Sequence, residues 1–198
     1  MDPWVVEVLR EGYRIPLVRS PRLSRDPPSR LTYSPGTPKG DALESEVEKL
    51  LSKGAIEPAP CTPGLYSRLF VVVNHDGTWR PIIDLSEFNK LVLRTRFRME
   101  TVQSVLSSVR KGDWMVSIDL KNAFLQVPLH PESRPLVRFM TRAGPFQFRV
   151  LPFGLSTSPQ VFTRVMAPVS YILHGRGIRL RRYIDDWLVQ ADSLEDCI

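Results

Sequence analysis

The spacing of apolar residues along the chain predicts helices in four stretches. The clearest lies in residues 41–53, where Asp41 is expected to cap the first turn and Gly54 to end the helix. Its apolar face is predicted to comprise Leu43, Val47, Leu50 and Leu51. Residues 159–174 form a longer predicted helix, which Pro168 should kink. Its predicted buried residues are Val161, Phe162, Val165, Met166, Val169 and Ile172. Residues 3–11 and 101–110 are expected to form the other two helices.

Short apolar runs between turn residues predict strands. They cover residues 69–73, 79–85, 114–118, 126–129, 136–140, 146–151, 180–184 and 187–189. Pro81 favours an edge position or a bulge for the second of these strands. A hairpin is expected around residues 142–144. Because strands and helices are mixed without a regular βαβ repeat, the predicted fold class is α+β.

Two adjacent carboxylates, Asp185 and Asp186, separate the last two apolar runs and are predicted to form the two-residue loop of a hairpin. Neighbouring like charges cost energy unless a cation lies near them. Asp119 also ends a predicted strand, so the two strands would bring Asp119 and Asp185 to one cavity if they were neighbours. An acidic surface turn and a Mg²⁺ site both fit this pattern, since Mg²⁺ prefers carboxylate and phosphate oxygens.

Residues 1–40 contain seven prolines, with arginines scattered among them, and are predicted to be largely extended after the first helix. The segment is interpreted as a linker or as an arm that lies on the domain. The candidate domain therefore covers residues 41–198.

The chain has a net charge of +6, carried mostly by arginine, which favours a nucleic-acid partner. A coding bias towards arginine would give the same composition. Arg179, Arg181 and Arg182 precede the Asp185–Asp186 pair and could bind a nucleic-acid backbone or protect a solvated edge strand. No apolar run is long enough to span a membrane. Two cysteines are too few for a disulfide framework, so an intracellular setting is expected.

Four motifs in order resemble those of retroelement reverse transcriptases. They are Asp-Gly-Thr-Trp-Arg at residues 76–80 with Asp84, Leu85 and residues 88–90, Val-Ser-Ile-Asp-Leu-Lys-Asn-Ala-Phe at 116–124, Phe-Gln-Phe-Arg-Val-Leu-Pro-Phe-Gly-Leu-Ser-Thr-Ser-Pro at 146–159, and Tyr-Ile-Asp-Asp at 183–186. The resemblance covers about residues 43–191 and looks most like DIRS-type retrotransposons, with gypsy-like elements a close second. It implies the fingers and palm of a right-hand polymerase, with a palm sheet backed by helices.

The resemblance also implies roles for individual residues. Asp119 and Asp185 would hold two Mg²⁺ ions, or Mn²⁺ in their place, with Asp186 assisting and the Leu120 carbonyl near a metal. The implied nucleotide-binding residues are Arg80 for the triphosphate, Phe124 for exclusion of a ribose 2′-hydroxyl, and Phe153 and Gly154 along the nucleotide and template. Core packing is the competing interpretation of Phe124 and Phe153.

The expected function is therefore RNA-directed DNA synthesis, in which a deoxynucleoside triphosphate (dNTP) extends a primer 3′-hydroxyl on an RNA or DNA template. The alternatives are a non-catalytic nucleic-acid-binding remnant of a retroelement and an RNA-templated polymerase of another class. In the family, a primer-gripping hairpin and a thumb would follow the Asp185–Asp186 motif. The chain ends twelve residues after Asp186, so we expect these 198 residues alone to extend a primer poorly.

Overall fold

The computed structural model describes residues 2–26, 28, 33–34, 36–75 and 77–197. Asp76 of the motif at residues 76–80 lies outside the described residues, as do Pro27, Arg30 and Pro35 of the N-terminal segment. The chain forms two compact units, each described here by itself. The first unit contains residues 1–6, 95–123 and 159–198, and the second contains residues 7–94 and 124–158. Helix α1, Pro3–Glu11, is confirmed and runs from the first into the second.

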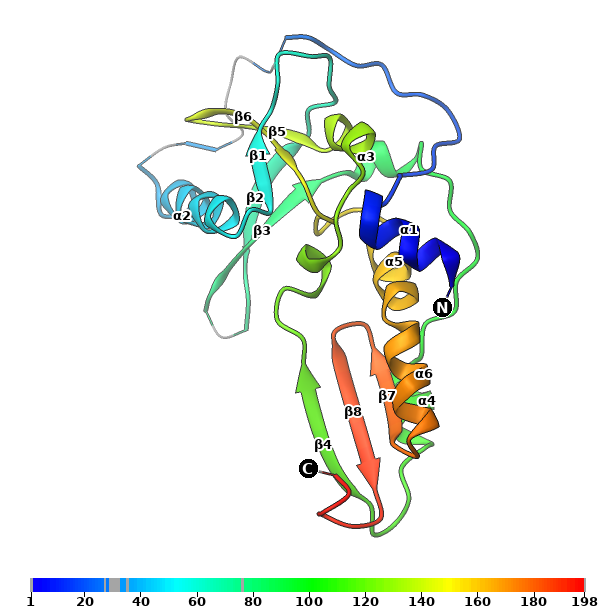
Figure 1. Cartoon of the computed structure of the whole chain (residues 1–198). Helices are drawn as coiled ribbons and strands as arrows, with labels where there is room; N and C mark the ends of the chain where they lie inside the picture. The colour runs from blue at the N-terminus through cyan, green and yellow to red at the C-terminus, as the bar shows by residue number, and fades with distance from the viewer. Residues whose placement is uncertain (1, 27, 29–32, 35, 76, 198) are drawn as a thin grey trace. The chain divides into compact units, whose positions relative to one another are not determined.

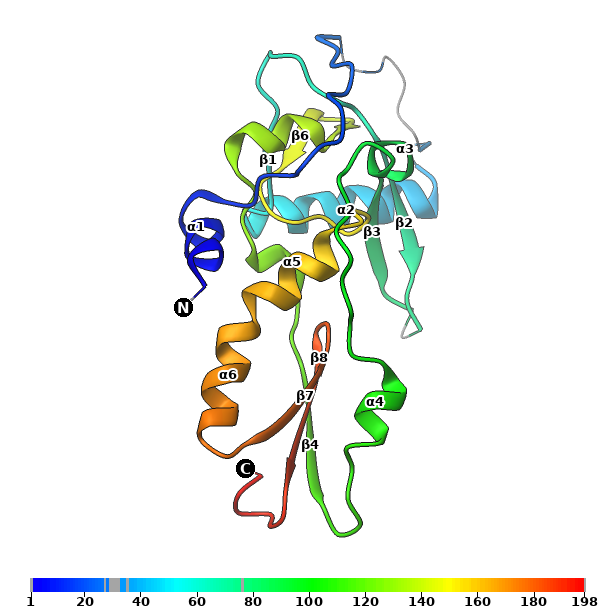
Figure 2. The same ribbon diagram turned by 90° about the vertical axis from the view of Figure 1, so that its right-hand side faces the viewer.

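The first unit is built on a three-stranded antiparallel sheet with the strand order β4-β8-β7. Its strands are β4 (Trp114–Asp119), β7 (Arg179–Tyr183) and β8 (Asp186–Ala191). The helices are α4 (Val102–Leu106), α5 (Ser158–Val165) and α6 (Ala167–Gly175). Figure 2 shows α6 and α4 on opposite sides of the sheet. The central strand β8 is the last one in the chain.

The second unit contains two sheets (Figure 1). It also contains most of the buried hydrophobic residues among those described. The hairpin β2 (Arg68–Val73) and β3 (Trp79–Asp84) forms one sheet, and the other has the order β1-β6-β5. These three strands are β1 (Ile56–Pro58), β5 (Arg138–Thr141) and β6 (Gly144–Phe148). The helices are α2 (Pro38–Ser52), α3 (Ser86–Asn89), and the 3-10 helices η1 (Ala123–Gln126) and η2 (Pro131–Leu136), of which η1 begins in the first unit. The predicted α+β class is confirmed.

Within the second unit, residues 13–24 of the N-terminal segment lie as an arm along other parts of that unit. Isolated bridges pair Tyr13 with Leu129, Leu17 with Val92, and Ser24 with Gly64. Tyr13 and Ile15 are buried, and the Ile15 N–H donates to the Ser133 hydroxyl. Residues 13–24 therefore form an arm and not a linker.

The hairpin that carries the two acidic residues differs from the prediction by one position. Tyr183 pairs with Asp186, so the two-residue loop is Ile184–Asp185 and Asp186 already belongs to β8. Both favoured two-residue hairpin turns need a positive φ at their first loop position, and Ile184 has φ 57°. The prediction was wrong because it assigned the loop to the two charged residues.

Three helix predictions need correction. Helix α2 begins at Pro38, because the Thr37 hydroxyl rather than Asp41 accepts the Gly40 N–H, and Leu51 on its predicted apolar face is exposed. Helix α4 ends at Leu106, four residues early. The helix over residues 159–174 was predicted to be kinked by Pro168, and the structure goes further: it is divided at Met166 into α5 and α6, because Pro168 has no N–H to continue the helical bonding.

The break between α5 and α6 also changes which side chains are buried. Val161 and Phe162 of α5 are buried as predicted, but Val169 and Ile172 of α6 are 40% and 52% exposed. The predicted strand over residues 126–129 is replaced by η1 and two isolated bridges. One bridge contains Pro128, which lacks the N–H that a regular ladder needs.

Candidate active site

The acidic residues of the first unit meet where two neighbouring strands end and begin. Asp119 is the last residue of β4 and Asp186 is the first of β8, and the two are directly opposite each other. Directly opposite residues project to the same face of a sheet. Asp185 precedes Asp186 in the loop, and its carbonyl accepts the Leu120 N–H at 3.0 Å. The backbone of Leu120 is thereby tied to the acidic loop.

The loop itself is held in a conformation that its sequence disfavours. Ile184 is β-branched, and a positive φ costs such a residue on the order of 1–3 kcal/mol. The Trp187 side chain is buried, and its Nε1–H donates to the Ile184 carbonyl at 3.2 Å. This contact helps to hold the turn that positions Asp185.

The strand register arranges side chains in rows across one face of the sheet, which we call the carboxylate face. The three rows are Asp119–Asp186–Tyr183, then Ser117–Leu188–Arg181, then Met115–Gln190–Arg179. The Gln190 amide donates to the Ser108 hydroxyl after α4, so α4 lies towards this face. Helix α5 lies towards the opposite face, where Arg182 donates to the Thr163 carbonyl.

The three arginines that were predicted to bind nucleic acid have different surroundings. Arg179 forms ion pairs with Asp113 and Asp192, each at 2.8 Å. The hydrogen bonds that the Arg179 guanidinium donates hold the pKa of the Asp113 carboxyl below its usual range, and the Arg110 N–H adds to this effect. Burial lowers the pKa of the Arg182 guanidinium, and the Glu100 carboxylate partly offsets this effect. Arg181 is exposed, and no ion pair or side-chain hydrogen bond is recorded for it within the described residues.

In the second unit, three of the predicted nucleotide-binding side chains lie together. The Arg80 guanidinium carbon is 5.7 Å from the centre of the Phe153 ring, within range of a cation–π interaction. The Phe124 and Phe153 rings are 5.2 Å apart between centroids and tilted by 51°. Both rings are half-buried and Arg80 is exposed, so the cluster presents a cation beside aromatic surface.

Gly154, next to Phe153, approaches β3 more closely than a side chain would allow. It has φ 113°, and a Cβ atom there would lie 2.2 Å from the Ile83 carbonyl oxygen. The Asn89 side chain holds the same loop, because it donates to the Gly154 carbonyl and accepts the Ser156 N–H. Asn89 belongs to the motif at residues 88–90, but its contact with this loop could not be predicted from the sequence.

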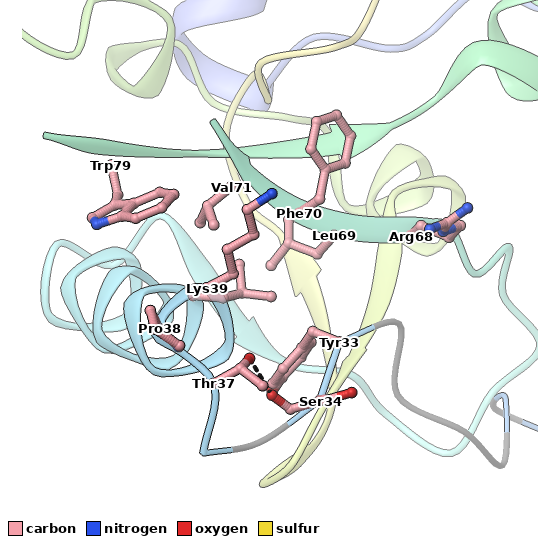
Figure 3. Close-up of a pocket in the computed structure, with 11 residues that line it drawn as sticks. Tyr33, Ser34, Thr37, Pro38, Lys39, Arg68, Leu69, Phe70, Val71 and Trp79 are labelled. Atoms are coloured by element: carbon pink, nitrogen blue, oxygen red, sulfur yellow. Dashed lines mark hydrogen bonds between the residues drawn. The ribbon is translucent and has the colours of Figure 1, made fainter. Parts of the chain in front are cut away.

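The β2–β3 hairpin that carries Arg80 has two different faces. Leu69, Val71 and Trp79 point towards α2 and line a cavity of about 880 Å³ (Figure 3). Phe70 points the other way, and Arg80 shares that side because it is directly opposite Val72. The hairpin therefore presents Arg80 away from the cavity.

The donor set at Asp119, Asp185 and Asp186 consists of hard carboxylate oxygens, which suit Mg²⁺. Within the described residues, no group of three or more His, Cys, Asp or Glu side chains could hold a metal ion. Mg²⁺ is commonly held by one or two carboxylates together with substrate phosphates. The chemistry of these carboxylates therefore fits Mg²⁺, with further ligands needed from elsewhere.

Comparison with known proteins gives a consistent result. Residues 72–198 match the family model described as reverse transcriptase (RNA-dependent DNA polymerase). The enzymatic polyprotein of Cestrum yellow leaf curling virus is 30% identical over 156 residues, which is 76% of this chain and 24% of that protein. The Pol polyprotein from transposon gypsy of Drosophila melanogaster is 26% identical over 163 residues, covering 79% of this chain and 15% of that protein.

A solved structure supports the fold. The foamy viral protease–reverse transcriptase in complex with double-stranded DNA matches with a TM-score of 0.70 and 23% identity, covering 92% of this chain and 32% of that one. The chain thus spans about a third or less of these three similar proteins. Among the helices within the described residues, none has the length and apolar character needed to cross a membrane.

Proposed function

Because the chain belongs to the reverse transcriptase family, we propose that it carries a nucleotidyl-transfer centre that extends a primer 3′-hydroxyl with dNTPs on an RNA or DNA template. The observation that carries this proposal is the opposition of Asp119 and Asp186, with Asp185 in the adjoining loop. Two like charges directly opposite each other destabilise a sheet unless a cation neutralises them. A divalent cation bound between them would neutralise this repulsion.

In this proposal Asp119 and Asp185 would hold two Mg²⁺ ions, or Mn²⁺ in their place, and Asp186 would assist them. The Leu120 carbonyl is the backbone candidate, since its N–H is already bonded to the acidic loop. When bound, such ions neutralise phosphate charge and activate the attacking oxygen. The contribution of the chain is to position the carboxylates, because phosphoryl transfer depends mainly on positioning and charge neutralisation.

The cluster of the second unit supplies the proposed nucleotide contacts. The Arg80 fork would bind the triphosphate, because a guanidinium can donate to two phosphate oxygens at once. Phe124 would exclude a ribose 2′-hydroxyl, and Phe153 and Gly154 would lie along the nucleotide and template. The 5.7 Å contact between Arg80 and the Phe153 ring supports a shared role for these residues.

Because these 198 residues alone are expected to extend a primer poorly, the test uses the chain lengthened C-terminally by a thumb of the family. Primer extension with Mg²⁺ or Mn²⁺ is compared between this lengthened unsubstituted chain and its Asp185→Asn and Glu195→Gln variants. Glu195 is an exposed acid near the end of the chain and serves as the charge-matched control. We expect extension that Asp185→Asn reduces by at least about a hundredfold, as loss of an important catalytic group does, and that Glu195→Gln leaves unchanged. Nucleic-acid binding without extension by either the unsubstituted chain or the control would favour the non-catalytic alternative.

We also propose that the chain comes from a retrotransposon. The gypsy transposon relative supports it, but the similar viral polyprotein fits a viral source equally well. The DIRS-type assignment rests on the motif resemblance alone. Sequencing of the flanking gene would test it, since a DIRS-type element is expected to encode a tyrosine recombinase, and its absence would count against the DIRS-type assignment.

A further inference from the structure

We propose that Arg181 binds a backbone phosphate of the primer strand close to its 3′ end. This inference rests on the proposed function, because it takes the acidic row as the site of the reacting 3′-hydroxyl. It names a strand-positioning residue for the same site. The ligand class is the phosphodiester of a nucleic-acid backbone.

The strand register places Arg181 one row from the carboxylates. Tyr183 lies opposite Asp186, and Arg181, two residues earlier in β7, lies opposite Leu188. Since side chains alternate between faces, Arg181 shares the carboxylate face with Asp119 and Asp186. Two residues of an extended strand span about 6.8 Å.

That spacing suits a nucleic-acid backbone. Each strand of a duplex advances by about 3.4 Å per nucleotide along the helix axis. If the duplex axis runs along the strands, the distance between the Arg181 row and the carboxylate row corresponds to about two nucleotides of the primer, counted upstream from its 3′ end. A guanidinium at this position would hold the primer backbone just upstream of the reacting end.

The neighbouring arginines of β7 are unsuited to this role. Arg179 shares the carboxylate face but is engaged by Asp113 and Asp192. Arg182 projects to the opposite face and donates to the Thr163 carbonyl. Arg181 is exposed, and the described residues contain no carboxylate paired with it. Of the three, Arg181 alone combines the correct face with an available guanidinium.

The surroundings of Arg181 are also suited to an anion. A pocket of about 460 Å³ at the start of β7 is lined by Arg110, Arg179 and Arg181 among others. Arg110 is exposed, so the pocket wall carries a second cation besides the engaged Arg179. The hydroxyls of Ser107 and Ser108 donate to the helix carbonyls of Ser104 and Val105. The guanidiniums are therefore the main donors that this wall can offer to a phosphate.

The experiment measures binding of a primer–template duplex to the 198-residue chain at low ionic strength and across a salt series. For Arg181→Gln we expect about tenfold weaker binding and a slope of log K against log salt that falls by about 0.9, the value for one lost phosphate contact. Arg181→Lys should keep the slope, because it keeps the charge. Arg176→Gln, an exposed charge-matched control before β7, should change neither quantity.

A second measurement locates the contact. Primers with one uncharged methylphosphonate at each of the first linkages from the 3′ end are compared between the unsubstituted chain and Arg181→Gln. We expect a methylphosphonate at one linkage, about two nucleotides from the 3′ end, to weaken binding to the unsubstituted chain. The same substitution should not weaken binding to Arg181→Gln. A structural role for Arg181 would not produce coupling to a single linkage.

Several results would overturn the proposal. The first is that the unsubstituted chain does not bind the duplex, and the second is that Arg181→Gln binds it as tightly as the unsubstituted chain. The third is that Arg176→Gln weakens binding as much as Arg181→Gln does. The fourth is that methylphosphonates weaken binding to Arg181→Gln as much as to the unsubstituted chain. The binding assay needs no catalysis, so Asp185→Asn should retain the Arg181 effect. If the Arg181 effect is found but the chain lengthened by a thumb of the family never extends a primer, the proposed function is refuted and the phosphate contact is not.

Discussion

Asp119 and Asp186 lie directly opposite each other across the β4–β8 pair, at the point where one strand ends and the other begins. Opposed like charges in an antiparallel pair are destabilising by roughly 0.2–1 kcal/mol. The arrangement therefore costs stability in the absence of a cation and favours cation binding by the folded protein.

We expect Asp186→Asn to raise the free energy of unfolding in metal-free buffer by about the cost of one such pair. Added Mg²⁺ should stabilise the unsubstituted protein more than the variant, because a ligand stabilises only the state that binds it. Thermal melting with EDTA and with Mg²⁺ checks this, with Glu195→Gln as the control. A variant that melts below the unsubstituted protein in EDTA would contradict the argument from charge repulsion.

Phe124→Val should weaken discrimination against ribonucleotides. The Phe124 ring packs against Phe153 beside Arg80, so the smaller side chain should leave space for a 2′-hydroxyl. Single-turnover incorporation of dNTP and of the matching ribonucleotide measures the ratio. Phe139→Val, in the buried core of the same unit, controls for a general loss of packing. Unchanged discrimination in Phe124→Val would assign Phe124 to core packing.

Gly154→Ala should destabilise the second unit more than Gly144→Ala. Both glycines have a positive φ, 113° and 117°, so each substitution carries the backbone strain of that region. Only at Gly154 would the new Cβ also meet a backbone oxygen, at 2.2 Å from the Ile83 carbonyl, whereas nothing lies within 4 Å at Gly144. Urea denaturation of the two variants measures the difference. Equal destabilisation would mean that the loop can move away from β3.

The Asp113–Arg179 pair should make stability depend on pH in the acidic range. The Arg179 donors lower the pKa of Asp113 in the folded state, so the unfolded chain binds the proton more readily. The stabilisation is therefore present above the unfolded pKa of about 4 and is lost as pH falls through the folded value. We expect Asp113→Asn to be less stable near neutral pH and the difference to shrink as pH falls below about 4. Urea titrations across this range measure it, and a difference that grows on acidification would contradict it.

The elements that could be predicted from the sequence are those with strong local signals. Strand β4 was predicted because an apolar run ends at a charge, Asp119, and the β5–β6 hairpin because Gly144 follows a polar turn. The predicted position of the acidic loop was wrong by one residue. The two charges suggested Asp185 and Asp186 as the turn, whereas the positive φ that the turn requires is at Ile184.

Other features depend on contacts that no local pattern contains. The face on which each β7 arginine lies follows from the register with β8, and a shift of one residue would exchange the faces. The partners of Arg179 come from residues 113 and 192, on either side of it in the chain. The two-unit division crosses the chain at residues 6–7, 94–95, 123–124 and 158–159. The first crossing lies inside α1, and the last two lie inside the motifs at 116–124 and 146–159, so local composition does not mark them as boundaries.

The strand order β4-β8-β7 has a consequence for synthesis of the chain on the ribosome. Among the strands of the described residues, β8 is the one that pairs with β4, and it is translated roughly 70 residues later. At about 5–20 residues per second, β4 waits for several seconds before its partner exists. During that time its apolar residues Trp114, Met115, Val116 and Ile118 have no strand beside them, and even in the folded protein they are at least 37% exposed. Nascent chains are therefore most vulnerable to aggregation, and most in need of chaperones, between the emergence of β4 and that of the final hairpin.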